Sequence, residues 1–552
     1  MTKPNQNDKH LSRIPESLRE LAGDRLLAFK EACLEKELSP QEDALLYDLN
    51  RLFAMSDYVA FTLQKHPEWA EALWRSSLNE ACTAKKYTEK LEALTDITHE
   101  ASFMKTIRNF RHFEMLRILW RYCLRYATLE AHLKELSDLA DSLLRYCKIW
   151  IYGQCEALYG VPEAEGLKQN LIIVLLGKLG SRELNFSSDI DLMFCFPKHG
   201  KTQNGPKSIA NEQFFALMCH QLVKVLSEVT EEGFVYRLDL RLRPYGQSGP
   251  LVMSFNALET YYQVHGRDWE RYALVKARIL TGSRQEKRAL HTMLNRFVYR
   301  RYLDFSVFES LRTMKGKVQD EVKRRKLQNN LKLGPGGIRQ IEFLAQMFQL
   351  LRGGKERQFQ NRKLSTILSR LGSANVLSIK NAKKLIESYE YLRSSEHFLQ
   401  MIRDEQTHAL PTEKADETRL AWMMGFDSYE DYIKALRKIT SYVSKQFDKM
   451  STPLVPGEEK QKEELVFKAL WAHPNDLEIQ KKIQDKFNVP QSIFDDIKAF
   501  KESALVKSIR QLGVERLDVF IPHLLACVFQ YPEHPSLLKD TSLLTSKVAR
   551  RS

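Results

Sequence analysis

Two aspartates one residue apart, Asp189 and Asp191, stand at the start of a short apolar run. If residues 189–196 form a strand, successive side chains alternate between two faces, so both carboxylates share one face. The other face would bury Ile190, Leu192, Phe194 and Phe196. Two carboxylates this close repel each other unless a cation lies between them. The pair predicts Mg²⁺, because Mg²⁺ takes oxygen ligands and leaves room for substrate phosphates.

A third carboxylate, Asp239, lies on the polar side of a second alternating run, residues 234–244. The same side carries Arg237, Arg241 and Arg243. A half-buried strand explains the alternation. One acid among three arginines indicates a site for a metal ion and phosphate, because arginine donates two parallel hydrogen bonds to phosphate oxygens. A solvated edge strand with ordinary charge pairing is the alternative interpretation.

A glycine turn precedes the aspartate pair. Residues 171–176 are a compact β-branched run, which predicts a strand ending at Gly177. The residues that would contact phosphates are the small residues Gly180 and Ser181 and the cations Lys178, Arg182, Arg241 and Arg243. A predicted helix over residues 212–230 separates the two carboxylate strands. These elements predict a small mixed sheet with a crossover helix.

Four segments resemble the signature motifs of the glutamine synthetase adenylyltransferase / adenylyl-removing enzymes, which belong to the polymerase-β-like nucleotidyltransferases. The segments are residues 177–192, 241–252, 266–278 and 332–343. The similarity extends from about residue 56 to about residue 411 and continues more weakly to the C-terminus. Members of that family carry two such domains in tandem: the first removes AMP from a tyrosine of glutamine synthetase, and the second attaches it.

The sequence contains one such constellation of glycine turn and acids. Residues 249–255 and 266–272 are similar to the removing half of the family. The chain therefore resembles a stand-alone removing half with part of the connecting helical region. Three positions differ from the usual motifs of the family. Ser181 stands where glycine is usual, a glycine upstream of Gly177 is missing, and Gln340 replaces an acid.

The resemblance implies Mg²⁺-dependent nucleotidyl transfer at an α-phosphorus, with Asp189, Asp191 and Asp239 as catalytic metal ligands for one or two ions. It implies that inorganic phosphate attacks the AMP–tyrosine bond of adenylylated glutamine synthetase and releases ADP. A PII-type signal protein and glutamine tune the family's activity. On the resemblance alone, Lys276, Arg278 and Arg339 join the site. Two alternatives stay open: attachment of AMP from ATP to glutamine synthetase or another protein, and a non-catalytic regulatory remnant.

The chain of 552 residues is long enough for roughly three or four domains. The predicted fold is mainly α, with an inserted α/β nucleotidyltransferase domain followed by a helical bundle. The predicted parts are an N-terminal helical domain (1–165), the nucleotidyltransferase domain (166–265), a helical domain that completes the active site (266–450), a linker (451–464) and a helical tail (465–552).

Composition limits the location and the partners. No apolar run reaches membrane-spanning length and the N-terminus does not resemble a signal peptide, so we expect a cytoplasmic protein without a membrane partner. Eight scattered cysteines without disulfide or metal spacing predict reduced, buried thiols. The net charge of +14 is spread over many predicted helices, which favours solvated helix faces over a nucleic-acid partner.

The glycine-rich segment 332–337 precedes a predicted helix over residues 339–351. Backbone N–H groups at such a helix start can hold a phosphate. A tight turn between two helices explains the glycines equally well. A second long amphipathic helix is predicted over residues 385–402.

Overall fold

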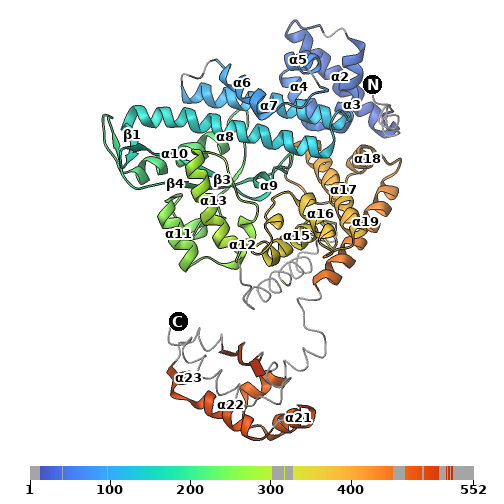
Figure 1. Ribbon diagram of the computed structural model, residues 1–552. Helices are drawn as coiled ribbons and strands as arrows, with labels where there is room; N and C mark the ends of the chain where they lie inside the picture. Colours follow the sequence, from blue (N-terminus) through green and yellow to red (C-terminus); the bar gives the residue numbers. More distant parts are fainter. Residues whose placement is uncertain are drawn as a thin grey trace. The chain divides into compact units, whose positions relative to one another are not determined.

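The computed structural model describes residues 13–300 except 40, 41, 77, 96 and 98, residues 316, 327 and 329–451, residues 466–508 except 488 and 489, and residues 517–525 except 519 and 523. The chain divides into two compact units, Met1–Lys449 and Met450–Ser552 (Figure 1). The predicted divisions at residues 165 and 265 fall inside the first unit, and those domain boundaries stay predictions.

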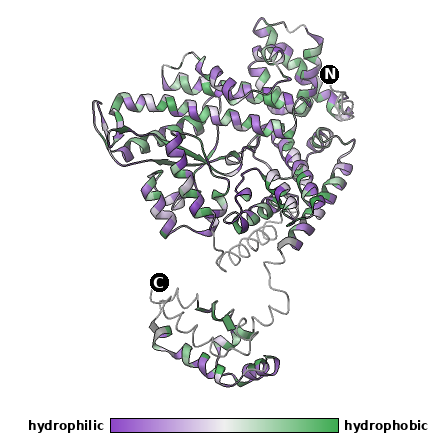
Figure 2. Ribbon diagram, viewed as in Figure 1, coloured by the Kyte–Doolittle hydropathy of each residue, from purple (hydrophilic) through white to green (hydrophobic). Residues whose placement is uncertain are grey.

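The first unit begins with helices, as predicted. These are α2 (Glu16–Glu35), α3 (Asp43–Met55), α4 (Asp57–Lys65), α5 (Glu68–Arg75), α6 (Ala84–Glu92), α7 (Glu100–Cys123) and α8 (Leu129–Tyr159). Most of these helices carry both polar and apolar residues (Figure 2), as expected for amphipathic helices that bury one side. The long helix α8 ends at Gly160, whose positive φ of 82° suits glycine.

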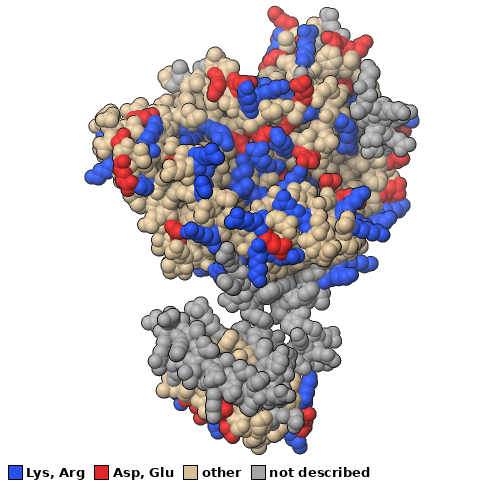
Figure 3. All heavy atoms as spheres, in the orientation of Figure 1, with Lys and Arg blue, Asp and Glu red and all other residues tan. Residues whose placement is uncertain are grey.

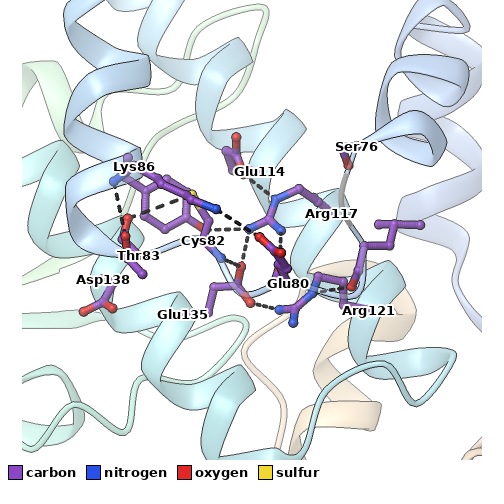
Figure 4. Close-up of polar contacts among 12 residues, drawn as sticks. Ser76, Glu80, Cys82, Thr83, Lys86, Glu114, Arg117, Arg121, Glu135 and Asp138 are labelled. Carbon is purple, nitrogen blue, oxygen red and sulfur yellow. Dashed lines mark hydrogen bonds and ion pairs between the residues drawn. The ribbon is translucent and has the colours of Figure 1, made fainter. Parts of the chain in front are cut away.

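Buried ion pairs join α7 to α8 (Figure 4). Arg117 pairs with Glu114 on its own helix, at 2.8 Å between Nε and Oε2, and with Glu135 on α8. Arg121 also pairs with Glu135, whose other oxygen accepts a hydrogen bond from the backbone N–H of Cys82. These side chains are almost completely buried, so removing one partner would leave an uncompensated charge in the core. The network therefore fixes α8, which supports the glycine turn described below.

A mixed five-stranded sheet lies beside α8. Its strands are β3 (Ile172–Leu175), β4 (Ile190–Phe196), β6 (Leu238–Asp239), β7 (Val252–Ser254) and β8 (Arg278–Ile279). The order is β6-β4-β3-β8, and β7 also pairs with β4. β3 is antiparallel to β4 and β8, whereas β6 and β7 run parallel to β4. The predicted mixed sheet and its crossover helix, α10 (Asn211–Ser227), are confirmed.

Both faces of β4 are covered. On one face, the ring of Phe196 stacks on Phe215 of α10 with 5.2 Å between centroids. On the other, the hydroxyl of Tyr262 in α11 (Phe255–Val264) lies 3.6 Å from the sulfur of Met193. Cys195 is fully buried. The polar face predicted for this strand is therefore limited to the end that carries Asp191.

A second, three-stranded sheet was not predicted. It comprises β1 (Val161–Ala164), β2 (Leu167–Lys168) and β5 (Lys201–Gln203), in the order β2-β1-β5. It begins before the predicted boundary at residue 166. Its strands are too short to produce a clear alternating pattern.

The rest of the first unit, in its described residues, is mainly helical. Its helices are α12 (Asp268–Leu274), α13 (Arg284–Val298), α15 (Ile338–Arg352), α16 (Leu364–Ser373), α17 (Ile379–Arg403), α18 (Lys414–Met423) and α19 (Tyr429–Ser451), with short 3₁₀ turns η1 (Gly246–Ser248) and η2 (Arg357–Phe359). The predicted helices 339–351 and 385–402 correspond to α15 and α17. A Cβ on Gly336 would lie 1.9 Å from the carbonyl oxygen of Thr440 in α19. This close approach favours the tight inter-helix turn over a phosphate site.

The second unit contains α21 (Leu477–Phe487), α22 (Ser492–Glu502) and α23 (Ala504–Ser508). It has its own apolar core, which includes Phe467, Leu470, Trp471, Ile483, Phe494 and Ile497. Residues 452–464 of the predicted linker lie outside the described residues. In the described part of the chain, seven cysteines are unpaired and buried, and no helix is both long and apolar enough to cross a lipid bilayer.

Candidate active site

The sheet brings Asp191 and Asp239 together. β4 and β6 are parallel neighbours, and Asp191 pairs with Asp239 in their register. Neighbouring strands lie about 4.8 Å apart, so the two residues are direct neighbours on adjacent strands. Asp189 lies just before β4, and the backbone N–H of Ile190 donates to the carbonyl of Arg237 at 2.9 Å. The predicted convergence of acids from two neighbouring β segments is therefore present.

The glycine turn packs against Asp191. Gly177 has a φ of +52°, and a Cβ there would lie only 2.1 Å from Oδ2 of Asp191. The residue must therefore be glycine for two reasons, because it takes a left-handed conformation and because the carboxylate occupies the space of a side chain. Gly177 begins the single turn of helix α9 (Gly177–Gly180). The carboxylate of Asp191 thus lies beside the start of this turn.

The three acids differ in their partners. Arg237 Nε donates to Asp189 Oδ1 at 3.0 Å. Asp239 accepts hydrogen bonds from Arg241, at 2.8 Å from the backbone N–H and 3.0 Å from Nε, and these lower the pKa of Asp239. Among the described residues, no side chain donates a hydrogen bond to Asp191. Burial, followed by the charges of Asp239 and Asp189, raises the pKa of Asp191 to about 6.

The chemistry of this group suits a hard cation. Its donors are carboxylate oxygens, and a cation would offset the repulsion that raises the pKa of Asp191. In the described part of the chain, however, no three Asp, Glu, His or Cys side chains are already spaced to hold a metal ion. Asp189 and Asp239 are instead hydrogen-bonded to their arginines. The residue types fit a divalent cation, and the side chains of Asp189 and Asp239 are hydrogen-bonded to arginines.

Lys178 is part of a buried ion pair. Its Nζ lies 3.2 Å from both carboxylate oxygens of Glu396 in α17. His408 Nδ1 lies 2.8 Å from the same carboxylate. Burial lowers the pKa of Lys178 to about 7, and the charge of Glu396 opposes this effect. A phosphate contact by Lys178, as predicted, would compete with this pair.

The end of the glycine turn does not reach the acids. A Cβ on Gly180 would meet the carbonyl oxygen of Lys276 at 2.2 Å. The hydroxyl of Ser181 donates to the carbonyl of Lys178 at 3.1 Å. Arg182 turns towards α8, where its Nη1 lies 3.2 Å from Asp138. The structure therefore brings Gly177, rather than Gly180 and Ser181, to the carboxylates.

The long strand predicted over residues 234–244 is wrong. β6 contains only Leu238 and Asp239, and Tyr245 takes a left-handed φ of 61° in the turn that follows. Arg243 folds back to donate to the carbonyls of Leu240 at 2.8 Å and Gly249 at 3.2 Å, so it stabilises the loop. The hydrogen bond with Asp239 raises the pKa of Arg241, and Asp189 and Asp191 add to this effect. Arg241 is thus the predicted arginine that lies near all three acids.

Comparisons with known proteins find matches that include the residues of this site. Residues 46–293, which contain all three acids, match the family model described as glutamate-ammonia ligase adenylyltransferase. The bifunctional glutamine synthetase adenylyltransferase/adenylyl-removing enzyme of Shewanella woodyi is 40% identical over 522 residues, which cover 94% of this chain and 54% of that protein. Residues 46–293 are thus similar to the glutamate-ammonia ligase adenylyltransferase family.

The chain spans about half the length of the curated relative that it matches. Residues 312–451 match a second family model, described as GlnD PII-uridylyltransferase. That segment supplies α15 and α17, whose acids Glu342 and Glu396 pair with lysines of the first segment. Two matched segments therefore contribute to one site.

Sequence reasoning missed two residues of this candidate site, Glu342 and Glu396. Arg237 was noted beside Asp239, but it was not among the residues predicted to contact phosphates. Glu342, whose Oε1 lies 2.8 Å from Lys276 Nζ, follows the glycine-rich turn closely. Glu396 lies within a long helix with no local motif, and only the fold places it beside Lys178.

The remaining residues that were carried over by resemblance have structural partners. Both Nη groups of Arg278 reach Asp141 in α8, at 2.6 and 2.8 Å, and its Nη2 also donates to the carbonyl of Leu179 at 2.9 Å. Arg339 lies in the first turn of α15. Gln340 accepts a hydrogen bond from the backbone N–H of Gly336 at 3.0 Å. The unusual glutamine thus stabilises the glycine-rich turn and does not contact the acids.

Proposed function

We propose that this chain is a Mg²⁺-dependent nucleotidyltransferase that removes AMP from a tyrosine of adenylylated glutamine synthetase. The observation that carries the proposal is the pairing of Asp191 with Asp239 on adjacent strands, with Asp191 packed against Gly177. This places the two carboxylates next to each other beside the glycine turn, where they can bind a divalent cation together. The similarity of the chain to that family supports the same reaction class.

The proposed reaction is a phosphorolysis. An oxygen of inorganic phosphate attacks the α-phosphorus of the AMP group, and the bond between that phosphorus and the tyrosine oxygen breaks. The products are ADP and tyrosine, whose oxygen takes the proton that the phosphate gives up. Arg241 lies near all three acids and would stabilise negative charge on the transferred group, as would the nearby Lys332.

Asp189, Asp191 and Asp239 are the residues that would hold Mg²⁺. When bound there, the ion would neutralise the acids and stabilise negative charge on the phosphates. Arg237 and Arg241 form ion pairs with Asp189 and Asp239, respectively. The proposal predicts that Asp191→Asn abolishes activity while the fold is kept.

One feature of the sequence supports removal over attachment of AMP. Residues 249–255 and 266–272 resemble the removing half of the family. Attachment of AMP from ATP, to glutamine synthetase or another protein, is the second candidate, because the same metal chemistry serves both directions.

One experiment separates the two directions. The chain is incubated with Mg²⁺, phosphate and AMP-modified glutamine synthetase, and ADP is measured. A parallel reaction contains ATP and unmodified glutamine synthetase, and AMP incorporation is measured. ADP formation that disappears in Asp191→Asn supports removal. AMP incorporation without ADP formation would show that the chain attaches AMP.

A non-catalytic remnant is the third candidate. It predicts no activity in either reaction, and the binding test is Mg²⁺-dependent nucleotide binding by the parent chain. Loss of that binding in Asp189→Asn/Asp191→Asn would tie it to the acids. Absence of any binding in the folded parent favours the remnant.

The partners follow from the reaction. They are adenylylated glutamine synthetase, the nucleotide and phosphate, so we place the reaction in the cytoplasm. The match of residues 312–451 to a PII-uridylyltransferase model supports regulation by a PII-type signal protein. Adding such a protein to the ADP assay tests this part, and an unchanged rate at saturating concentrations would contradict it.

A further inference from the structure

A cavity of about 380 Å³ lies at the other end of the glycine turn from Asp191. Its walls come from α8, α16, α17 and the turn itself, and it is lined by Arg182, Glu183, Arg278, Arg362, Lys363 and Ser365, among others. Lys and Arg atoms also gather in the middle of the face shown in Figure 3, next to the region of α8 and α9 in Figure 1. None of the three acids of the proposed active site lines this cavity.

One cation of the cavity lacks a carboxylate partner. Arg182, Arg278 and Lys363 each pair with an acid of α8. Arg362 donates through Nε to the carbonyl of Ala277 at 2.6 Å, and no carboxylate in the described part of the chain pairs with it. Burial and the nearby Arg278 lower the pKa of Arg362. An anion in the cavity would provide the missing counter-charge.

The helix α16 adds backbone donors. It is ten residues long, begins after Lys363, and has no side-chain cap at its N-terminus. The first-turn N–H groups of a helix carry partial positive charge and are suited to bind phosphate. Ser365, in this first turn, lines the cavity. Arg362 and the start of α16 thus lie on the same wall of the cavity.

An unpaired acceptor indicates the rest of the ligand. Glu183 is only 4% exposed and lines the cavity. Its Oε2 is buried and has no hydrogen-bond partner among the described residues. A buried acceptor without a donor is costly. A hydroxyl group on a bound molecule would satisfy it.

We propose that this cavity binds a small phosphate monoester, with its phosphate on Arg362 and the start of α16 and a hydroxyl of its other part on Glu183. The cavity volume is in the range of small-molecule sites. Because Gly180 lines the cavity and Gly177 contacts Asp191, such a ligand touches the turn that supports the acids. This inference goes beyond the proposed function and does not depend on it.

The test is isothermal titration of the full chain in the presence of a chelator and without glutamine synthetase. The probes are ribose 5-phosphate, a monoester with free hydroxyls, and inorganic phosphate. We expect ribose 5-phosphate to bind more tightly than phosphate. Arg362→Ala and Ser365→Asp should each weaken its binding about tenfold or more, because each disturbs a charge-assisted contact.

Control variants distinguish loss of this cavity site from loss of the three acids and from misfolding. An acid in the first turn favours a helix, so Ser365→Asp should keep the melting temperature of the parent while it repels phosphate. Arg357→Ala, at an exposed arginine of η2, and Asp189→Asn/Asp191→Asn should bind like the parent. Binding lost in the double aspartate variant but kept in Ser365→Asp would overturn the proposal. So would no binding by the folded parent, or equal affinity for the two probes.

Discussion

Replacing Gly177 with alanine tests whether the glycine turn positions Asp191. The new Cβ would lie 2.1 Å from Oδ2 of Asp191, whereas ordinary contacts begin at 3.4 Å. The carboxylate, the turn or both must therefore move, by more than about 1 Å in total. A misplacement of about 1 Å at a reacting group can reduce the rate about 100-fold. We expect the rate of ADP formation to fall by at least this factor.

The cost in stability has a separate origin. Gly177 has a φ of +52°, and a left-handed conformation costs an alanine about 1–2 kcal/mol. Gly166→Ala shares this cost, because its φ is +71°, but its Cβ would meet nothing within 4 Å. Gly153→Ala lies in α8 with open space around it, and it should be neutral or stabilising by about 0.5–1 kcal/mol.

The three variants are compared by urea unfolding, by ADP formation and by the shift in melting temperature with Mg²⁺. Gly177→Ala should lose activity and the Mg²⁺ shift. Gly166→Ala should lose only stability, and Gly153→Ala should keep activity, the Mg²⁺ shift and stability. The Mg²⁺ shift reports on the acids even if the substrate is a different one. Activity of Gly177→Ala within threefold of the parent would refute the argument. An equal loss in Gly166→Ala would assign the effect to the backbone conformation instead.

Substitutions at three further positions are tested by urea unfolding. Arg278→Ala should lower the free energy of unfolding by about 3 kcal/mol, because it leaves the buried carboxylate of Asp141 without its bidentate partner. A decrease below about 1 kcal/mol would contradict this. Gln340→Leu should cost about 1–3 kcal/mol by leaving the N–H of Gly336 unpaired, while Gln340→Glu, which keeps an acceptor, should cost less. Burial and a neighbouring guanidinium lower the pKa of His112 from 6.5 to about 3. Below pH 6.5 the unfolded chain therefore binds more protons, so this histidine should cost the folded state about 2 kcal/mol at pH 5 relative to pH 7, and His112→Asn should remove that part of the pH dependence.

The sequence was sufficient to predict that Asp191 and Asp239 lie together, because the signals for their strands are local. Residues 171–176 predicted a strand that the structure places at Ile172–Leu175, and the strand predicted over 189–196 is Ile190–Phe196. Both are short apolar runs; the first ends at a glycine and the second begins at an acid. The pairing of Asp191 with Asp239 followed from placing two such strands in one sheet.

The same reasoning failed where polar side chains bond to the local backbone. Residues 234–244 alternate in polarity, but Arg243 uses its guanidinium to satisfy loop carbonyls, and Tyr245 turns the chain with a positive φ. Alternation of polar and apolar residues alone cannot distinguish this loop from a strand. The second sheet was missed because β2 has only two residues and β5 three, too few for any periodicity.

Contacts between distant segments could not be predicted from the sequence. Lys178 and Glu396 are 218 residues apart, and no motif in α17 marks this glutamate.

These buried pairs explain why two segments with different family matches form one structural unit. Lys178 and Lys276 belong to the segment 46–293, and their partners Glu396 and Glu342 belong to 312–451. Breaking a buried pair costs about 3–5 kcal/mol, since one charge is left uncompensated. A fragment that ends at residue 293 would leave both lysines beside the glycine turn without their acids. The helical segment is therefore needed to hold the turn, and with it Asp191, in place.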